Sequence, residues 1–226
     1  ARPRELADAG AKTAVPAGAL DALFYDAFRR LGDPYLANRF VARRQGRPRL
    51  RLARPFPRQV DTQARANGLT AGRVWAVMTI ESAWCPQVVS HAGAVGLLQL
   101  MPITARRVSR ALGEPGFPLA RLFEPGPNIR LGAWYLGQLV RKFNGQYALA
   151  VAAYNGGPHN VTAWLQRKAR TADLDEFVEE IPMRETRLYV KKVVALATRY
   201  ASDLGEPYRV LLQRRLDPTV QKNIDF

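Results

Sequence analysis

The chain has 226 residues, enough for one domain with an appendage, and 47% of them are hydrophobic, which is ample for a buried core. Its formal net charge of +15 predicts attraction to a polyanion such as nucleic acid, an anionic membrane surface or an acidic cell-wall polymer. A single cysteine excludes an internal disulfide, two histidines cannot build a histidine-rich metal site, and no apolar run approaches the roughly 20 residues of a membrane span.

A helix is predicted over residues 19–31, where apolar residues recur at helical spacing before the stop signal Gly32. The segment 39–58 then carries eight arginines, and no acidic residue lies between Asp33 and Asp61. Prolines in this segment favour an extended connection over the body of the protein. Its charge is typical of a solvated surface, and also suits docking to a cell-wall polymer or contact with nucleic acid.

The rest of the pattern is helical, with loops marked by glycine and proline. Thr70 is expected to cap a helix that Pro86 stops, and Asn128 is expected to cap a long helix after a proline-rich loop over 113–127. Other helices are predicted at 58–67, from Pro102 to about Leu112, at 146–154, from Pro158, and at about 184–202. The sequence therefore predicts a mainly α fold, with short helices round a cleft.

Glu81 is the unusual residue of the helix that follows Thr70. The apolar residues Val74, Val77 and Met78 share its face, and a charge on such a face is costly to bury without a partner. The carboxyl is either a core group satisfied by backbone or arginine, or it is kept protonated for a purpose. In an apolar pocket it would protonate a leaving oxygen near neutral pH and then act as a base.

A second carboxylate is not evident close to Glu81 in the sequence. No Asp or Glu lies between Ser82 and Gly113, and only Glu114 and Glu124 follow in the proline-rich loop. Glycosidases of the usual kind need two carboxylates, so a lone acid suits a reaction whose nucleophile is part of the substrate.

Four short motifs follow one another along the chain. They are Glu81-Ser82, Gly96-Leu97-Leu98-Gln99-Leu100-Met101-Pro102, Ala153-Tyr154-Asn155-Gly156-Gly157-Pro158, and Ile181-Pro182 followed by Glu185-Thr186-Arg187 and Tyr189. Together they resemble the lytic transglycosylase family, most closely the catalytic domain of the soluble periplasmic type, over roughly residues 68–200. Leu98 stands where this family often has Met, a volume-conserving difference.

The resemblance implies a lysozyme-like helical domain and an enzyme that cuts the β-1,4 bond between N-acetylmuramic acid and N-acetylglucosamine in peptidoglycan. Such an enzyme is a lyase, because it closes a 1,6-anhydro ring on the muramic acid instead of adding water. Glu81 would protonate the glycosidic oxygen and then deprotonate the 6-hydroxyl of the sugar, while the substrate's N-acetyl group stabilises the positive intermediate. No cofactor and no metal is implied.

The resemblance also implies residues that would contact the substrate or the catalytic acid. Gln99 and Met101 would line the glycan cleft, and Tyr154 would lie close to Glu81 and orient it or the sugar. Ser90 would help to steer the carboxyl or the acetamido group.

The remaining implied residues support or extend this site. Glu185 would bind saccharide and Tyr189 would support the site. Asn155 is expected to hold the turn after Tyr154, because Asn tolerates the special backbone conformation of turns.

Three parts of the chain are expected: a helix with an Arg- and Pro-rich segment over 1–67, the lysozyme-like catalytic domain over 68–204, and a tail over 205–226. The expected partner is the peptidoglycan glycan strand and not nucleic acid. We expect a monomer without an integral membrane segment, in the periplasm or cell envelope, whose signal peptide has been removed.

Two alternative functions stay open at this point. A muramidase of the same fold would add water and leave reducing ends, so only the products separate it from a lyase. A non-catalytic module would bind the cell wall or another polyanion through its arginines, and its binding would survive the loss of Glu81.

Overall fold

The computed structural model describes residues 19–31, 35–37, 52–167, 173–206 and 215–222. Contacts divide the chain into two units, residues 1–51 and 52–226, and each is described by itself. In the first unit, α1 (Ala19–Arg30) confirms the helix predicted over 19–31. Residues 38–51, most of the arginine-rich segment, lie outside the described residues, so its extended course stays a prediction.

The second unit is built from helices, and within the described residues β pairing is limited to isolated bridges. The elements are α3 (Pro57–Ala66), α4 (Ala71–Ser82), α5 (Pro102–Ala111), η1 (Leu119–Phe123), α6 (Pro125–Lys142), α7 (Tyr147–Gly156), α8 (Pro158–Arg167), α9 (Leu174–Glu179) and α10 (Arg184–Leu204). The prediction of a mainly α fold is confirmed.

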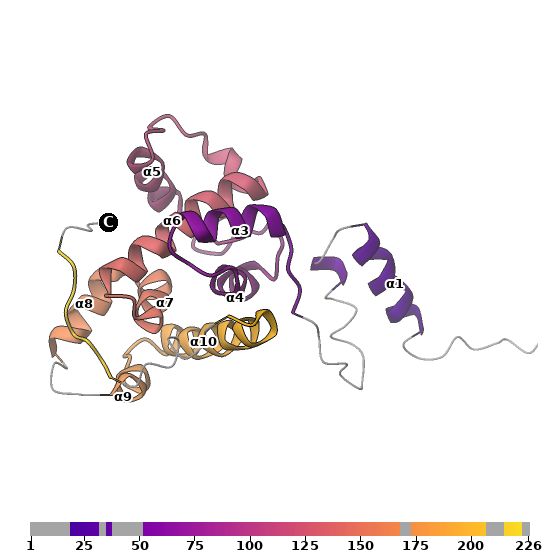
Figure 1. Ribbon diagram of the computed structural model, residues 1–226. Helices are drawn as coiled ribbons and strands as arrows, with labels where there is room; N and C mark the ends of the chain where they lie inside the picture. The colour runs from indigo at the N-terminus through magenta and orange to yellow at the C-terminus, as the bar shows by residue number, and fades with distance from the viewer. Residues whose placement is uncertain (1–18, 32–34, 38–51, 168–172, 207–214, 223–226) are drawn as a thin grey trace, which may run out of the picture. The chain divides into compact units, whose positions relative to one another are not determined.

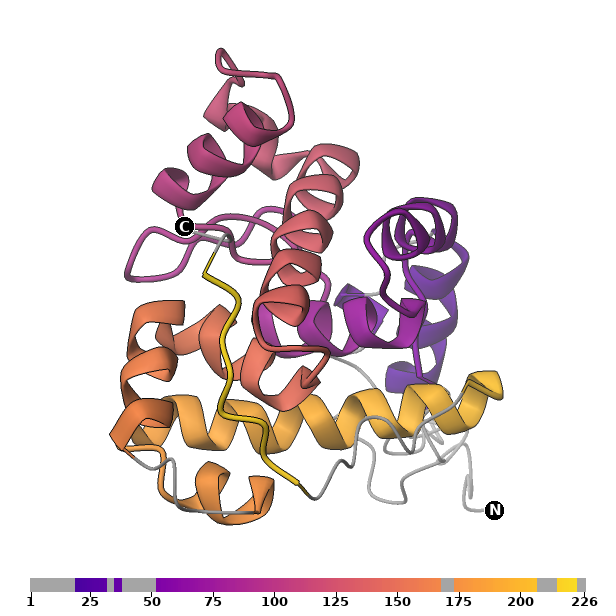
Figure 2. The same cartoon turned by 60° about the vertical axis from the view of Figure 1, so that its left-hand side comes forward.

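The long helices α6 and α10 organise this unit (Figures 1 and 2). Helix α6 packs against α3, α5, η1 and α7, whereas α10 packs against α4, α7 and α9. Helix α7 lies between them and is apolar on almost every side, as expected for a helix that has no solvated face. In the described ranges, no helix is long and apolar enough to cross a membrane.

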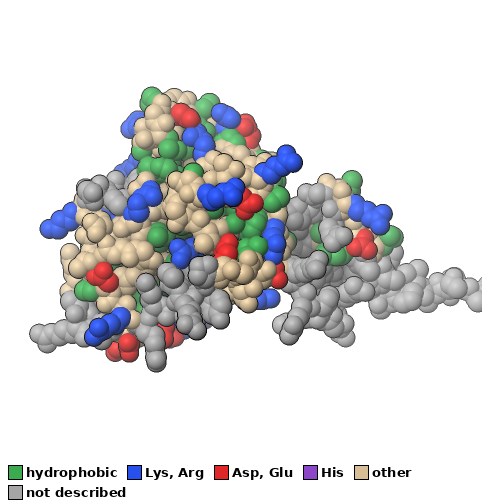
Figure 3. Space-filling model, viewed as in Figure 1, with side chains coloured by type: hydrophobic (Ala, Val, Ile, Leu, Met, Phe, Trp, Pro, Cys, Tyr) green, Lys and Arg blue, Asp and Glu red, His purple; other side chains and the backbone are tan. Residues whose placement is uncertain are grey.

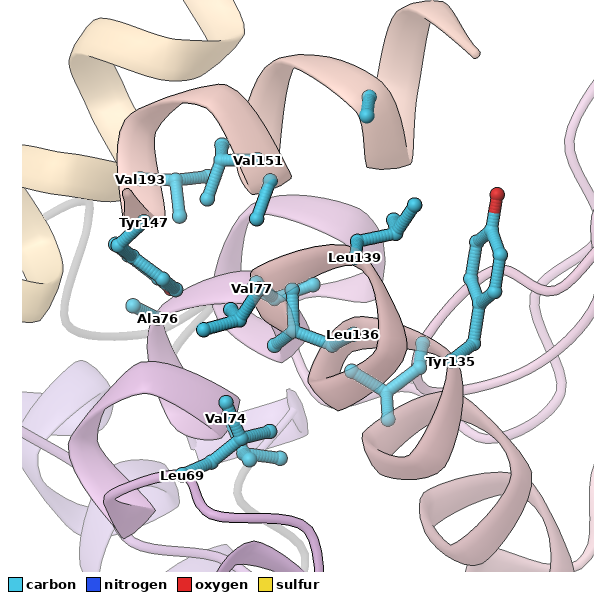
Figure 4. Close-up of a cluster of buried hydrophobic side chains, with 14 of the residues drawn as sticks. Leu69, Val74, Ala76, Val77, Tyr135, Leu136, Leu139, Tyr147, Val151 and Val193 are labelled. Atoms are coloured by element: carbon cyan, nitrogen blue, oxygen red, sulfur yellow. The ribbon is translucent and has the colours of Figure 1, made fainter. Parts of the chain in front are cut away.

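The core forms where α4, α6, α7 and α10 meet. Figure 4 shows Val77 of α4, Leu136 of α6, Val151 of α7 and Val193 of α10 in one cluster, and the solvent exposure of all four is 1% or less. Each buried aliphatic side chain of this size contributes about 1.5–3 kcal/mol relative to an exposed one. The packing of these four helices therefore fixes the positions of the polar groups that they carry at their ends.

The predicted end of the helix that carries Glu81 was wrong. Helix α4 ends at Ser82 and not near Pro86, because Ala83 and Trp84 take positive φ values of 48° and 70°. Thr70 is the residue before α4, but its side chain makes no capping hydrogen bond. Glu81 consequently lies in the last turn of its helix.

The loop predicted over 113–127 is partly helical, since it contains η1 and the start of α6. Helix α6 begins at Pro125, so Asn128 is inside the helix and does not cap it. The sequence suggested a cap because Asn128 stands at the junction of a proline-rich segment and an apolar repeat. In the structure the proline itself starts the helix, which its fixed φ allows.

A segment of the tail, residues 215–222, runs along the second unit (Figure 2). Gln146 holds it from both sides: its Nε2 donates to the Asp217 carbonyl at 2.7 Å, and its Oε1 accepts from the Asp217 N–H at 2.9 Å. Further along, the Gln221 N–H donates to the Lys142 carbonyl. The possible strand around Tyr208 lies outside the described residues.

Candidate active site

Glu81 lies in the last turn of α4, where Tyr189 of α10 donates a hydrogen bond to its Oε1. Burial raises the pKa of Glu81 to about 7. The hydrogen bond from Tyr189 acts in the opposite direction, because it stabilises the carboxylate, and the negative charge of Glu185 raises the pKa again. A carboxyl with this pKa exchanges its proton near neutral pH.

Glu185 and Tyr189 are four residues apart on α10, so they share one face of the helix. Glu185 is exposed, whereas Tyr189 is only 7% exposed. Burial, followed by the charge of Glu81, raises the pKa of Tyr189 well above its usual value. Tyr189 is therefore a neutral phenol, and its hydrogen is available to Glu81, over the whole physiological pH range.

Ser82 ties the end of α4 to the loop that follows it. Its Oγ donates to the Leu97 carbonyl at 2.8 Å and accepts a hydrogen bond from the Trp84 N–H at 3.1 Å. Because Ser82 is adjacent to Glu81, this contact sets the loop against the carboxyl-bearing turn.

Asn128 organises the same loop from α6. Its Oδ1 accepts from the Leu98 N–H at 2.8 Å, while its Nδ2 donates to the carbonyls of Val95 and Leu122 at 2.9 and 2.8 Å. The side chain is fully buried and its amide is satisfied on both sides. Sequence reasoning missed this role, because nothing in a single sequence links Asn128 to a loop some 30 residues earlier.

Tyr154 of α7 holds the other backbone group of Leu98. Its hydroxyl donates to the Leu98 carbonyl at 2.7 Å, and its ring lies 5.4 Å from the ring of Tyr135 of α6. Burial raises the pKa of Tyr154, and the charge of Glu81 is the next cause, so the two groups are within electrostatic reach of each other. The closeness of Tyr154 to Glu81 that the resemblance implies stays a prediction, and this electrostatic effect supports it.

Gln99 and Ser90 are bonded within their own loop. Gln99 takes a positive φ of 44°, and its Nε2 donates to the carbonyls of Gly96 and Val88 at 2.8 and 3.2 Å. Its amide hydrogens are thus used inside the protein, which leaves the amide oxygen as the group that can meet a donor. Ser90 Oγ accepts from the Ala94 N–H at 3.0 Å.

Met101 precedes α5 and is 38% exposed, so it can offer an apolar surface to a ligand. Within the part of the chain that the structure describes, Glu81 has no hydrogen bond to Met101, Gln99 or Ser90. Their predicted contacts with a sugar stay predictions.

Asn155 plays a structural role different from the one expected. It lies within α7, and the positive φ of the turn, 85°, falls on Gly157 instead. Its Oδ1 accepts a hydrogen bond of 2.7 Å from the hydroxyl of Thr186, a fully buried residue of α10. Asn155 and Thr186 therefore join the helix that carries Tyr154 to the helix that carries Tyr189.

No group of three or more His, Cys, Asp or Glu side chains that could hold a metal ion is found within the described ranges.

Comparison with known proteins places the chain in a known family. A family model described as the transglycosylase SLT domain matches residues 59–177, more than half of the chain. The soluble lytic murein transglycosylase of Escherichia coli (strain K12) is 40% identical over 132 residues, which are 58% of this chain and 20% of that protein. The membrane-bound lytic murein transglycosylase C of Klebsiella pneumoniae is 36% identical over 112 residues, 45% of this chain and 31% of that protein.

Solved structures of lytic transglycosylases are also similar to this chain. An inactive mutant of the lytic transglycosylase Slt from Pseudomonas aeruginosa has a TM-score of 0.77 and 33% identity, over 87% of this chain and 33% of that chain. The 70 kDa soluble lytic transglycosylase from Escherichia coli has a TM-score of 0.80 and 29% identity, over 88% of this chain and 33% of that chain. The predicted lysozyme-like helical fold is confirmed. The chain spans a fifth to a third of the length of these relatives.

Proposed function

Because the chain belongs to the transglycosylase SLT domain family, we propose that it cleaves peptidoglycan without water, at the bond between N-acetylmuramic acid and N-acetylglucosamine. The observation that supports this most is Glu81, a partly buried residue whose carboxyl has a pKa of about 7 and receives a hydrogen bond from Tyr189. One group of this kind can serve first as the acid and then as the base of the same reaction.

In the first step, protonated Glu81 gives its proton to the glycosidic oxygen while the bond from that oxygen to C1 of the muramyl residue breaks. The carbonyl of the substrate's own N-acetyl group stabilises the positive charge at C1. The new carboxylate keeps the hydrogen bond from Tyr189, which stabilises its charge until the second step.

In the second step, the Glu81 carboxylate removes the proton of the muramyl 6-hydroxyl, and that oxygen attacks C1 to close the 1,6-anhydro ring. Glu81 ends the cycle protonated, as it began, and no water is consumed. A near-neutral pKa suits both steps, because neither protonation state is strongly disfavoured.

The other site residues have proposed roles around this exchange. Tyr154 fixes the loop at Leu98 and lies within electrostatic reach of Glu81. Met101 and the amide oxygen of Gln99 would meet the sugar, and Ser90 would act in steering the acetamido group. Glu185, exposed on α10, would bind the saccharide.

A muramidase is the second candidate, and one observation favours it. The carboxylate of Glu185 is near enough to Glu81 to raise its pKa, so a second acid is present in space although it is distant in sequence. A hydrolase with two carboxylates would use it to activate water. The exposure of Glu185 and its place in the first turn of α10 suit substrate contact better.

The setting of the reaction is also a proposal. We assign the chain to the cell envelope, with peptidoglycan glycan strands as its partner, no nucleic acid, and action as a monomer. We also propose the division of the chain into three parts, 1–67, 68–204 and 205–226, with the catalytic groups in the middle part.

The test is digestion of purified peptidoglycan by the wild-type protein and by Glu81→Gln, followed by mass spectrometry of the soluble products. We expect anhydro-muropeptides from the wild type and a loss of about 10²–10⁴-fold in the variant. Glu176→Gln, the same change at an exposed position of α9, is the matched control and should keep full activity. Products with reducing muramic acid ends would replace the lyase by the muramidase, and full activity of Glu81→Gln would exclude both.

A further inference from the structure

A second feature of the molecule shares no residue with the site around Glu81. Helix α3, η1 and the first turns of α6 border a hollow of about 450 Å³. Three arginines line it, Arg58 from α3, Arg121 from η1 and Arg130 from α6, together with neutral amides and no acidic side chain. Figure 3, seen from the side on which α3 is in front, shows basic side chains exposed over this helix.

Two of the arginines are held in place by partners outside the lining. Arg121 Nε lies 3.2 Å from Glu124, and its guanidinium lies 5.9 Å from the centre of the Phe117 ring. Arg130 Nη2 lies 2.5 Å from Glu114. A guanidinium has five N–H donors, so each of these arginines keeps donors for a ligand.

Arg58 is different, because no described carboxylate pairs with it. Its position in the first turn of α3 also matters. The first turns of α3 and α6 both reach the hollow, at Arg58 and Gly126, and neither turn contains an acidic residue. The positive end of the α3 dipole therefore adds to the charge of the three guanidinium groups, whereas Glu124, the N-cap residue of α6, offsets the dipole of that helix.

The charge balance selects the kind of anion. Glu124 and Glu114 neutralise two of the three arginines, so one positive charge, that of Arg58, remains without a partner among the described residues. This surplus matches a carboxylate, with one negative charge, better than a phosphate with nearly two. Gln59 and Gln63 add neutral amide donors and acceptors to the lining, as a peptide backbone requires.

We propose that this hollow binds a carboxylate-bearing peptide, namely the stem peptide of a peptidoglycan strand. The proposal rests on the proposed function, which makes such strands the substrate. The site would hold the enzyme on strands that still carry peptides and would be indifferent to bare glycan. Part of the positive charge of the chain would then bind a specific group, in addition to attracting the anionic polymer in general.

The test is cosedimentation with insoluble peptidoglycan, either intact or stripped of its peptides by an amidase, in the Glu81→Gln background so that the polymer is not digested. Arg58→Gln is compared with Arg65→Gln, the same charge change at an exposed position of the same helix that does not line the hollow. We expect Arg58→Gln to weaken binding to intact polymer about tenfold, the loss of one strong charged contact, and Arg65→Gln less than twofold.

On stripped glycan, the two variants should bind equally. Arg58→Lys keeps the charge but loses the planar fork, so it should show an intermediate loss and also serves if Arg58→Gln folds poorly. The free stem peptide should displace the protein from intact polymer, whereas inorganic phosphate at matched ionic strength should not. Equal losses in the Arg58 and Arg65 variants, or displacement by phosphate as effective as by peptide, would overturn the proposal.

The outcome is separable from that of the proposed function. If the wild type releases anhydro-muropeptides but Arg58→Gln binds intact and stripped polymer as the parent does, only the peptide site is wrong. If the binding pattern is as expected but no anhydro products form, only the lyase is wrong.

Discussion

Tyr189, in the second turn of α10, donates a hydrogen bond to Glu81, in the last turn of α4, across 108 positions of the sequence. This contact joins two helices that also pack along each other through the core. It opposes the effects of burial and of the Glu185 charge on the carboxyl, so the pKa of about 7 is a balance between causes that raise it and this hydrogen bond, which lowers it.

Replacing Tyr189 with Phe should raise the pKa of Glu81 further, because the hydrogen bond that stabilises the carboxylate is lost while the carboxyl stays buried. In the proposed mechanism protonated Glu81 begins the reaction, so activity should fall as pH rises through this pKa. We expect the descending limb of kcat/KM against pH to move upward by roughly 1 in pH. Tyr200→Phe, a buried tyrosine of the same helix that bonds to Ala53 instead, should leave the limb in place; a shift in both variants would contradict the assignment.

Glu81 should also make the stability of the protein depend on pH. Its pKa rises from 4.5 unfolded to about 7 folded, so the folded state binds the proton more tightly. The contribution of protonated Glu81 to the free energy of unfolding is fully present below about pH 4.5, and it is lost as the pH rises through 7. The wild type should therefore lose free energy of unfolding between pH 4 and pH 8, whereas Glu81→Gln, which has no such proton, should not. The difference between the two proteins should change by up to about 3 kcal/mol over this range, in favour of the variant. Urea unfolding at both pH values measures this, and a difference between the two proteins that does not change with pH would refute it.

Thr186→Val tests the link between α7 and α10. The substitution keeps the shape but leaves the Asn155 oxygen without its donor, which should cost about 1–3 kcal/mol of unfolding free energy. We also expect kcat to fall, because Tyr154 and Tyr189 are carried by the two helices. Thr198→Val on the same helix removes a bond made within α10 and is the control for stability and kcat. A stability loss without any fall in kcat would restrict Thr186 to folding.

Gly132→Ala tests how closely α6 approaches the loop that contains Leu98. A Cβ at this position would lie 2.5 Å from Leu98 Cδ1 and 2.8 Å from Leu98 Cβ, so the loop or the helix must shift. We expect a loss of about 1–3 kcal/mol, measured by thermal unfolding. Gly116→Ala, in the loop before η1, would place its Cβ where nothing lies within 4 Å and should be close to neutral, or stabilising by up to about 1 kcal/mol through the lower entropy of the unfolded chain. Equal effects at both glycines would exclude close packing as the cause.

The helices were largely predictable, because apolar periodicity and proline or glycine at the boundaries are local signals. Pro102 and Pro158 start their helices as predicted. The end of α4 was not predictable, since it depends on positive φ values at Ala83 and Trp84, and neither residue type favours them. The start of α6 was misplaced because Asn128 stands where the sequence pattern favours a cap, whereas its side chain instead bonds to the loop at Leu98.

The catalytic candidate was visible in the sequence as a carboxyl on an apolar helical face, and the motifs identified the family. The supporting contacts were not visible. The bonds of Asn128 to the loop and of Thr186 to Asn155 join residues 30 or more positions apart, and no periodicity encodes them. Glu185 was expected beside Glu81 only because of the family resemblance, since a search along the chain finds acids only by sequence distance. The charge of Glu185 raises the pKa of Glu81, which agrees with that expectation.

Leu98 has both of its main-chain polar groups held, the N–H by Asn128 and the carbonyl by Tyr154. Every residue except proline has these two groups, so the geometry of the loop does not depend on the identity of the side chain at this position. A saturation library at position 98 should accordingly tolerate other aliphatic residues, with the limit set by the space in front of Gly132. The shape of this loop therefore depends less on the side chain at position 98 than on Asn128 and Tyr154, and loss of either of these two side chains should disturb the loop more than an aliphatic substitution of Leu98.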